Sequence, residues 1–142
     1  MFFRAGVFPL RCPIYTGIYI GMKVHLKVAL ASDAGEEFCG PGVLQLLDGI
    51  GRHGSIRQAA ADMGLSYVKA LKILNRLERE LGQALLVRHK GGAERGRTEL
   101  TPRAHTFMTD CLLLRAQLER AAGRAFEGFR RRQDRFPARR NP

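Results

Sequence analysis

The sequence predicts a mainly α-helical fold with one small β-hairpin, and three observations lead to this prediction. Apolar residues recur at helical spacing in four stretches between residues 43 and 129. Glycines close the first three stretches, at Gly54, Gly64 and Gly82. Residues 84–101 instead contain two strand-like runs around a glycine-rich turn. With 142 residues, the chain is long enough for one compact domain with a core of its own.

The first ordered segment is predicted to be a short strand. Apolar and polar residues alternate from Lys23 to Val28, which is typical of a half-exposed strand. Residues 35–42, with glycines at both ends and Pro41 between them, then break the chain. A core-packed helix follows, and its apolar stripe consists of Val43, Leu44, Leu46, Leu47 and Ile50.

The next two helices are short and close together in the sequence. Ser55 and Ser66 are each suited to cap the start of one of them. The inward stripes are Ile56, Ala59, Ala60 and Met63 in the first, and Ala70, Ile73, Leu74, Leu77 and Leu81 in the second. Two short helices joined by a tight turn at Gly64 predict a helix-turn-helix, in which the small Ala59 and Ala60 permit close helix crossing.

A β-hairpin wing and a long helix complete the pattern. The wing consists of residues 84–88, the turn from His89 to Thr98, and a return strand over Glu99–Thr101. Pro102 suits a first helical turn, and the apolar stripe after it continues for about 30 residues. Because so long a helix cannot bury itself on a small domain, we expect it to pack against a second copy. The expected dimerisation residues are Phe107, Cys111, Leu114, Leu118, Ala121 and Ala125.

Taken together, these residues resemble a known family of regulators. The winged helix-turn-helix of the LysR class is similar at Gly54, Ser55, Ala59, Ala60, Leu65, Ser66, Tyr67, Ala70, Leu74, Leu77, Leu81 and Gly82. A nearer resemblance, over roughly residues 23–130, is to the N-terminal DNA-binding domain of ModE-type molybdate-responsive regulators. It rests on Leu65-Ser66-Tyr67, Asn75, the leading strand and the long wing. Val68 and Lys69 depart from that subgroup, and we expect its molybdate-binding β-barrel domains to be absent here.

Charge favours double-stranded DNA as the partner. The chain carries 24 Lys and Arg against 13 Asp and Glu, a formal net charge of +11 that attracts polyanions. Long polar side chains on the second helix of the motif can reach base edges and phosphates. The expected recognition-helix contacts are Ser66, Tyr67, Lys69, Lys72, Asn75 and Arg76, and the expected wing contacts are Arg88, Lys90, Arg95 and Arg97. Ser66 can cap its helix, bind a phosphate, or do both.

Other function classes lack their motifs. His25, His53, His89 and His105 are scattered without metal-ligand spacing, and the three cysteines form no CxxC pair. The sequence therefore predicts no bound metal, no disulfide framework and a reducing, cytoplasmic location. Without a nucleophile elbow, a phosphate loop or paired carboxylates, we expect neither an enzyme nor a cofactor. Arg4, Pro9, Arg11 and Pro13 interrupt the apolar start, so no membrane span is expected.

Four segments and one function follow from these observations. Residues 1–21 are expected to be a non-native or disordered extension, 22–101 the DNA-binding domain, 102–132 the dimerisation helix, and 133–142 a basic disordered tail. We expect a dimeric, sequence-specific transcription regulator, linked to molybdenum only through the resemblance. The alternative is the DNA-binding subunit of a split regulator that depends on a separate oxyanion-binding protein.

Overall fold

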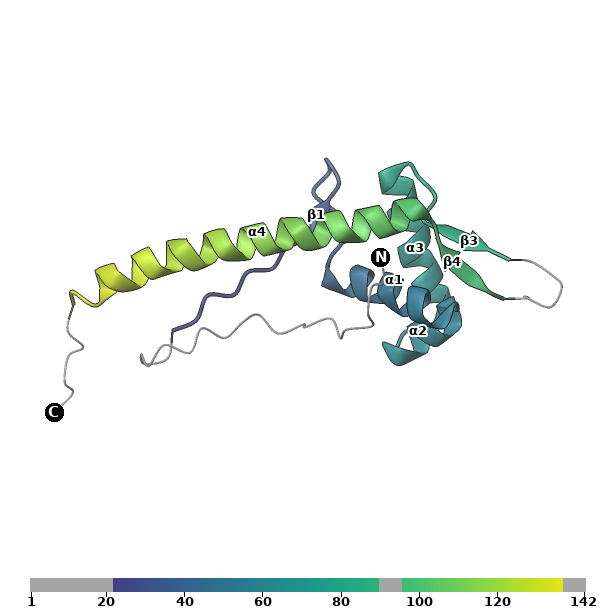
Figure 1. Ribbon diagram of the computed structural model, residues 1–142, viewed down its shortest axis with the longest axis horizontal. Helices are drawn as coiled ribbons and strands as arrows, with labels where there is room; N and C mark the ends of the chain where they lie inside the picture. Colours follow the sequence, from purple (N-terminus) through teal and green to yellow (C-terminus); the bar gives the residue numbers. More distant parts are fainter. Residues whose placement is uncertain (1–21, 90–95, 137–142) are drawn as a thin grey trace.

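The computed structural model describes residues 22–89 and 96–136 as four helices and two small antiparallel hairpins (Figure 1). The helices are α1 (Pro41–His53), α2 (Ile56–Asp62), α3 (Tyr67–Leu81) and α4 (Pro102–Gln133). The strands are β1 (Leu30–Ala31), β2 (Glu37–Cys39), β3 (Leu86–Arg88) and β4 (Thr98–Leu100). Helices α1, α2 and α3 pack together, while α4 extends away from them as a long arm (Figure 1). The predicted mainly helical winged fold is confirmed.

Helix ends lie where capping chemistry places them. Ser55 and Ser66 cap α2 and α3 by accepting hydrogen bonds from the amides of Gln58 (3.3 Å) and Lys69 (3.2 Å). Gly54 and Gly82 follow α1 and α3 in the left-handed conformation, with φ of 64° and 63°. These predicted starts and stops are confirmed because each is set by a few neighbouring residues.

One apolar core joins the three short helices to the first turns of α4. A Cβ atom on Gly49 of α1 would lie 3.0 Å from Cβ of Ala59 in α2, so these helices touch almost backbone to backbone. The close approach expected for Ala59 is therefore made with α1. The fully buried large side chains are Leu46, Leu47, Ile50, Leu74, Leu77 and Leu85.

The wing is anchored to the helices at its base. Leu86 pairs with Leu100, Val87 with Glu99, and Arg88 with Thr98. Before the first strand, the Glu78 carboxylate of α3 accepts hydrogen bonds from the amides of Leu85 (2.8 Å) and Leu86 (3.0 Å). The return strand is bound at its start, where the Thr98 amide donates to the Gly54 carbonyl (2.8 Å).

Thr101 joins the wing to the arm. Its hydroxyl donates to the Ala84 carbonyl (3.1 Å) and accepts from the Ala104 amide (3.2 Å) as the N-cap of α4. Its own amide donates to the Leu85 carbonyl (2.9 Å). The expected return strand included Thr101, whereas β4 ends at Leu100 because Thr101 caps the helix instead.

The predicted leading strand is wrong. Residues 22–29 form no strand, and Val24 and Leu26 are exposed although they alternate with polar residues. The hairpin begins later, where Leu30 pairs with the buried Cys39 and Gly35 turns the chain with φ of 80°. Residues 35–42, expected only to break the chain, contain β2. The alternation was misleading because a strand also needs a partner and a core face, and both lie further along the chain.

The expected dimerisation stripe of α4 has a buried part and an exposed part. Phe107 is only 5% exposed and lies in the core of its own chain, and Cys111 packs against the same core. Neither residue is therefore on the exposed surface of α4, because the first turns of this helix pack against the core of their own chain. Four other members of the stripe remain exposed: Leu114, Leu118, Ala121 and Ala125.

Within residues 22–89 and 96–136, none of the helices has the length and apolar character of a membrane-spanning segment.

Candidate nucleic-acid interface

The start of α3 is exposed. The turn between α2 and α3 is closed by the Leu65 amide, which donates to the Ala60 carbonyl (2.9 Å), and by Gly64 with φ of 65°. Past this turn, Tyr67 is 39% exposed and Val68 is 61% exposed. Ala70, three residues after Tyr67, is fully buried. The fold thus presents the first turn of α3 outward on a rigid base.

Tyr67 is oriented by a residue that the sequence interpretation missed. The guanidinium carbon of Arg57 in α2 lies 5.1 Å from the centre of the Tyr67 ring, a cation–π arrangement. Arg57 is itself exposed. Its basic character in the first turn of α2 was a usable signal, but only the packing of α2 against α3 shows that it reaches Tyr67.

Lys69 and Lys72 add positive charge beside this turn. Both are exposed, and within the described part of the chain neither side chain has an ion pair or hydrogen bond with another residue. Ser66 uses its hydroxyl to cap α3, which is one of the two roles expected for it. Flexible ammonium groups in this position are suited to contact phosphates.

Asn75 and Arg76 are engaged with other parts of the protein. Asn75 Oδ1 accepts a hydrogen bond from Nη2 of Arg88 at the end of β3 (3.1 Å). Arg76 Nη2 forms an ion pair with Glu36, before β2, at 2.7 Å. The structure therefore shows Arg76 bridging α3 to the β1–β2 hairpin, with its charge opposed by a carboxylate.

The wing contributes two described cations to the same end of the molecule. Arg88 ends β3, and Arg97 precedes β4 and forms an ion pair with Glu99 at 2.9 Å. Lys90 and Arg95, also expected to contact DNA, lie outside the described residues. Figure 1 shows the wing projecting away from α4.

Comparison with known proteins gives the family of this arrangement. Residues 42–105 match the family described as bacterial regulatory helix-turn-helix protein, lysR family. The segment is similar to the helix-turn-helix DNA-binding domains of that family, and we refer to it below as the LysR-type domain. The match gives the LysR family and not the ModE-type subgroup. No curated protein matches the chain.

Solved structures similar to the LysR-type domain include complexes with DNA. One is the DNA-binding domain of CbnR with DNA, at 23% identity and a TM-score of 0.48 over 61% of this chain and 93% of that one. Another is that of BenM at benA site 1, at 20% identity and a TM-score of 0.44 over 60% of this chain and 93% of that one.

A longer similar protein is a probable transcriptional regulator from Pseudomonas aeruginosa. It is 26% identical with a TM-score of 0.41, and the match covers 62% of this chain but only 26% of that protein. The matched part of the present chain thus covers about a quarter of that regulator's length.

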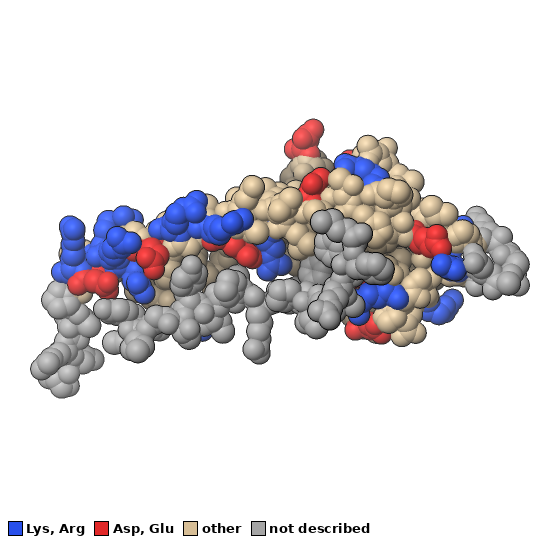
Figure 2. All heavy atoms as spheres, in the orientation of Figure 1, with Lys and Arg blue, Asp and Glu red and all other residues tan. Residues whose placement is uncertain are grey.

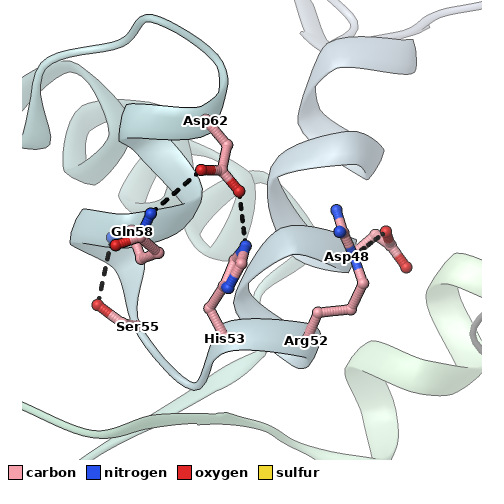
Figure 3. A network of polar contacts seen from close by, with 6 residues as sticks. All are labelled: Asp48, Arg52, His53, Ser55, Gln58 and Asp62. Atoms are coloured by element: carbon pink, nitrogen blue, oxygen red, sulfur yellow. Dashed lines mark hydrogen bonds and ion pairs between the residues drawn. The ribbon is translucent and has the colours of Figure 1, made fainter.

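A polar network braces the LysR-type domain behind its exposed helix (Figure 3). His53 at the end of α1 contacts Asp62 at the end of α2, with Nε2 and Oδ2 2.6 Å apart. Gln58 donates to the other Asp62 oxygen (3.2 Å), and Arg52 pairs with Asp48 (3.0 Å). The hydrogen bonds from Gln58 and His53 lower the pKa of Asp62 below its ordinary value. The network ties α2 to α1 and so supports α3 indirectly.

Charge is unevenly distributed over the surface of the molecule. Figure 2 shows Lys and Arg side chains gathered over the outer half of α4, with acidic side chains among them. Some arginines of α4 are paired: Arg115 with Glu119 at 2.7 Å, and Arg131, near the end of the helix, with Glu127 at 3.4 Å. Among residues 22–89 and 96–136, no group of three His, Cys, Asp or Glu side chains is placed to hold a metal ion.

Proposed function

We propose that this chain is a dimeric, sequence-specific transcription regulator that binds double-stranded DNA through α3 and the wing. One observation carries the proposal: the first two turns of α3, in the segment that matches the LysR family, carry four exposed side chains, Tyr67, Val68, Lys69 and Lys72. This set combines an aromatic hydroxyl, an apolar side chain and two cations. Side chains of these kinds can contact the base edges and phosphates of a major groove.

Each side chain has a distinct proposed role. Tyr67 and Val68 contact base edges, and the exposed Val68 is suited to the methyl group of thymine. Lys69 and Lys72 contact phosphates, as does Ser66 while it caps the helix. Asn75 and Arg76 contribute at the far edge of the groove after their bonds to Arg88 and Glu36 rearrange. Arg88 and Arg97 of the wing, together with Lys90 and Arg95, contact the flanking backbone.

The proposed dimer forms through the outer part of α4. Leu114 and Leu118 are exposed there, and Ala121 and Ala125 continue the same stripe. Two copies joined in this way would insert two α3 helices into successive major grooves, so the operator would be an imperfect palindrome. Burial of the leucines would supply the driving force for pairing.

A second proposal concerns the partner of α4. Leu112 and Leu113 are also exposed, Leu113 by 55%, and they lie beside the expected dimer stripe. A surface wider than one helical seam could seat a separate effector-binding chain, which would make this protein half of a split regulator. Co-purification of native complexes distinguishes a second copy from such a partner. Equilibrium dialysis of that complex against molybdate tests the link to molybdenum suggested by the ModE-type resemblance.

Selection from a randomised duplex pool tests the main proposal. The protein is incubated with the pool at about 150 mM salt, where non-specific binding is weak, and the bound DNA is sequenced. An enriched motif with two related halves is expected. A single unrepeated motif would contradict the dimeric arrangement, and binding without any enriched motif would contradict sequence specificity.

A further inference from the structure

Two cysteines from distant parts of the sequence meet where the β1–β2 hairpin touches α4. Cys39 ends β2 and is 3% exposed, and Cys111 is half-buried in the third turn of α4. Both line one small apolar pocket, together with Leu44, Leu114 and Arg115. Neither forms a disulfide in this structure.

The two thiols are in direct contact and differ in character. Cys39 donates a hydrogen bond to the sulfur of Cys111, which lowers the pKa of Cys111. The same hydrogen bond, followed by burial, raises the pKa of Cys39. Cys111 is also the more exposed of the two. The pair therefore consists of one accessible, more nucleophilic thiol and one sheltered thiol already beside it.

We propose that Cys39 and Cys111 are a redox modification site that closes into a reversible intrachain disulfide when the protein meets a hydroperoxide. The Cys111 thiolate attacks the peroxide oxygen, the O–O bond breaks, and an alcohol or water leaves as Cys111 becomes a sulfenic acid. The Cys39 sulfur then attacks the Cys111 sulfur, forming the S–S bond and releasing water. The two thiols together lose two electrons and two protons, and the peroxide is reduced.

The bond would join β2 covalently to α4. The hairpin carrying Cys39 also holds α3, through the Glu36–Arg76 ion pair. A 39–111 link would enclose α1, α2, α3 and the wing in one covalent loop. Because long loops lose the most unfolded-state entropy, the oxidised protein is expected to unfold at a higher temperature.

Peptide mapping of the full chain tests this directly. The protein is treated with hydrogen peroxide, its remaining thiols are alkylated, and it is digested and analysed without reduction. The expected product links the peptides of Cys39 and Cys111 with loss of two hydrogens, and dithiothreitol reverses it. Cys12→Ser should retain the link, whereas Cys39→Ser and Cys111→Ser should lose it. The oxidised protein should melt several degrees higher, and this difference should vanish on reduction.

Three results would overturn the proposal. Oxidation of Cys111 to a sulfinic acid without any link would show that Cys39 does not capture the sulfenic acid. A Cys111–Cys111 link between two chains would make the thiol an intermolecular site. A disulfide that involves Cys12 would show that the proposed pairing of Cys39 with Cys111 is wrong. The map of the unsubstituted protein decides among these even if a serine variant fails to fold.

Discussion

Arg88, the last residue of β3, donates a hydrogen bond from Nη2 to Oδ1 of Asn75 in α3, at 3.1 Å. Both residues were expected to contact DNA, and the structure shows them contacting each other. The bond links the wing to the middle of the candidate recognition helix. The two elements proposed to reach the duplex are thus oriented relative to each other before DNA is present.

A double-mutant cycle measures this link. Arg88→Ala and Asn75→Ala should each lower the free energy of unfolding, and their combination should fall short of the sum by about 0.5–1 kcal/mol. Urea denaturation provides the values. Asn75→Ala combined with Arg124→Ala, on the distant part of α4, is the matched control and should be additive. Additivity in both cycles would show that the Arg88–Asn75 bond contributes nothing in solution.

Glu78 is expected to stabilise the wing more than any surface pair. Glu78→Ala would leave the amides of Leu85 and Leu86 without their acceptor, at a loss of about 1–3 kcal/mol. Glu78→Gln retains an acceptor oxygen and should lose less. Chemical denaturation of both variants checks the prediction, and equal losses would mean that the carboxylate charge, and not the hydrogen bonding, matters.

The contact between α1 and α2 leaves little room for a methyl group at residue 49. Gly49→Ala would place Cβ 3.0 Å from Cβ of Ala59, which belongs to a short helix and cannot move alone. We expect a loss of about 1–3 kcal/mol. Gly42→Ala, also in α1 but with no atom within 4 Å of the new Cβ, should gain about 0.5–1 kcal/mol. Thermal melts of the pair give the comparison, and a gain at both positions would refute the packing argument.

Lys72 and Tyr67 should affect DNA binding in different ways. Lys72→Ala is expected to weaken binding to all sequences and to reduce the steepness of the salt dependence by about one unit. Tyr67→Phe should change the preferred sequence and leave the salt dependence intact. Fluorescence titrations at several salt concentrations, on selected and scrambled duplexes, distinguish the two. Equal losses on all duplexes from both variants would remove the division of roles.

Asp62 predicts an acid-sensitive contribution to stability. Its folded pKa lies below the ordinary value because Gln58 and His53 donate to the carboxylate, so the stabilisation is present above that ordinary value. It is lost as the pH falls through the lowered pKa. The melting-temperature difference between the wild type and Asp62→Asn should therefore shrink from about pH 7 to about pH 2. Asp33→Asn, exposed and without a polar contact among the described residues, should show no such trend.

The helices and the wing could be predicted because their signals are local. Ser55, Ser66, Gly54 and Gly82 define helix ends through contacts with residues at most a turn away. The apolar stripes of α1 and α3 follow directly from helical periodicity. The prediction of a leading strand was wrong for the opposite reason, since strand pairing depends on a partner that the alternating residues do not identify.

The arrangement of the site depended on contacts between distant residues. Nothing near Arg76 in the sequence indicates Glu36, and nothing near Tyr67 indicates that Arg57 covers it. The stripe of α4 was continuous in the sequence, yet packing assigns Phe107 to the core and leaves Leu118 outside. The sequence therefore identified the charged and apolar residues, and the fold determines which of them are exposed for contact with DNA or with another chain.

The hydrogen bonds of Thr101 fix the direction in which α4 leaves the domain. The helix has 32 residues and extends roughly 48 Å. Its start is held by three hydrogen bonds of the Thr101 hydroxyl and amide, two of them to the residues that precede β3. Any two domains joined through such arms would therefore have a separation determined by residue 101 and by the length of the helix. The tolerated distance between two operator half-sites would then be a mechanical property of the chain, adjustable by inserting or deleting helical turns without altering a single DNA contact.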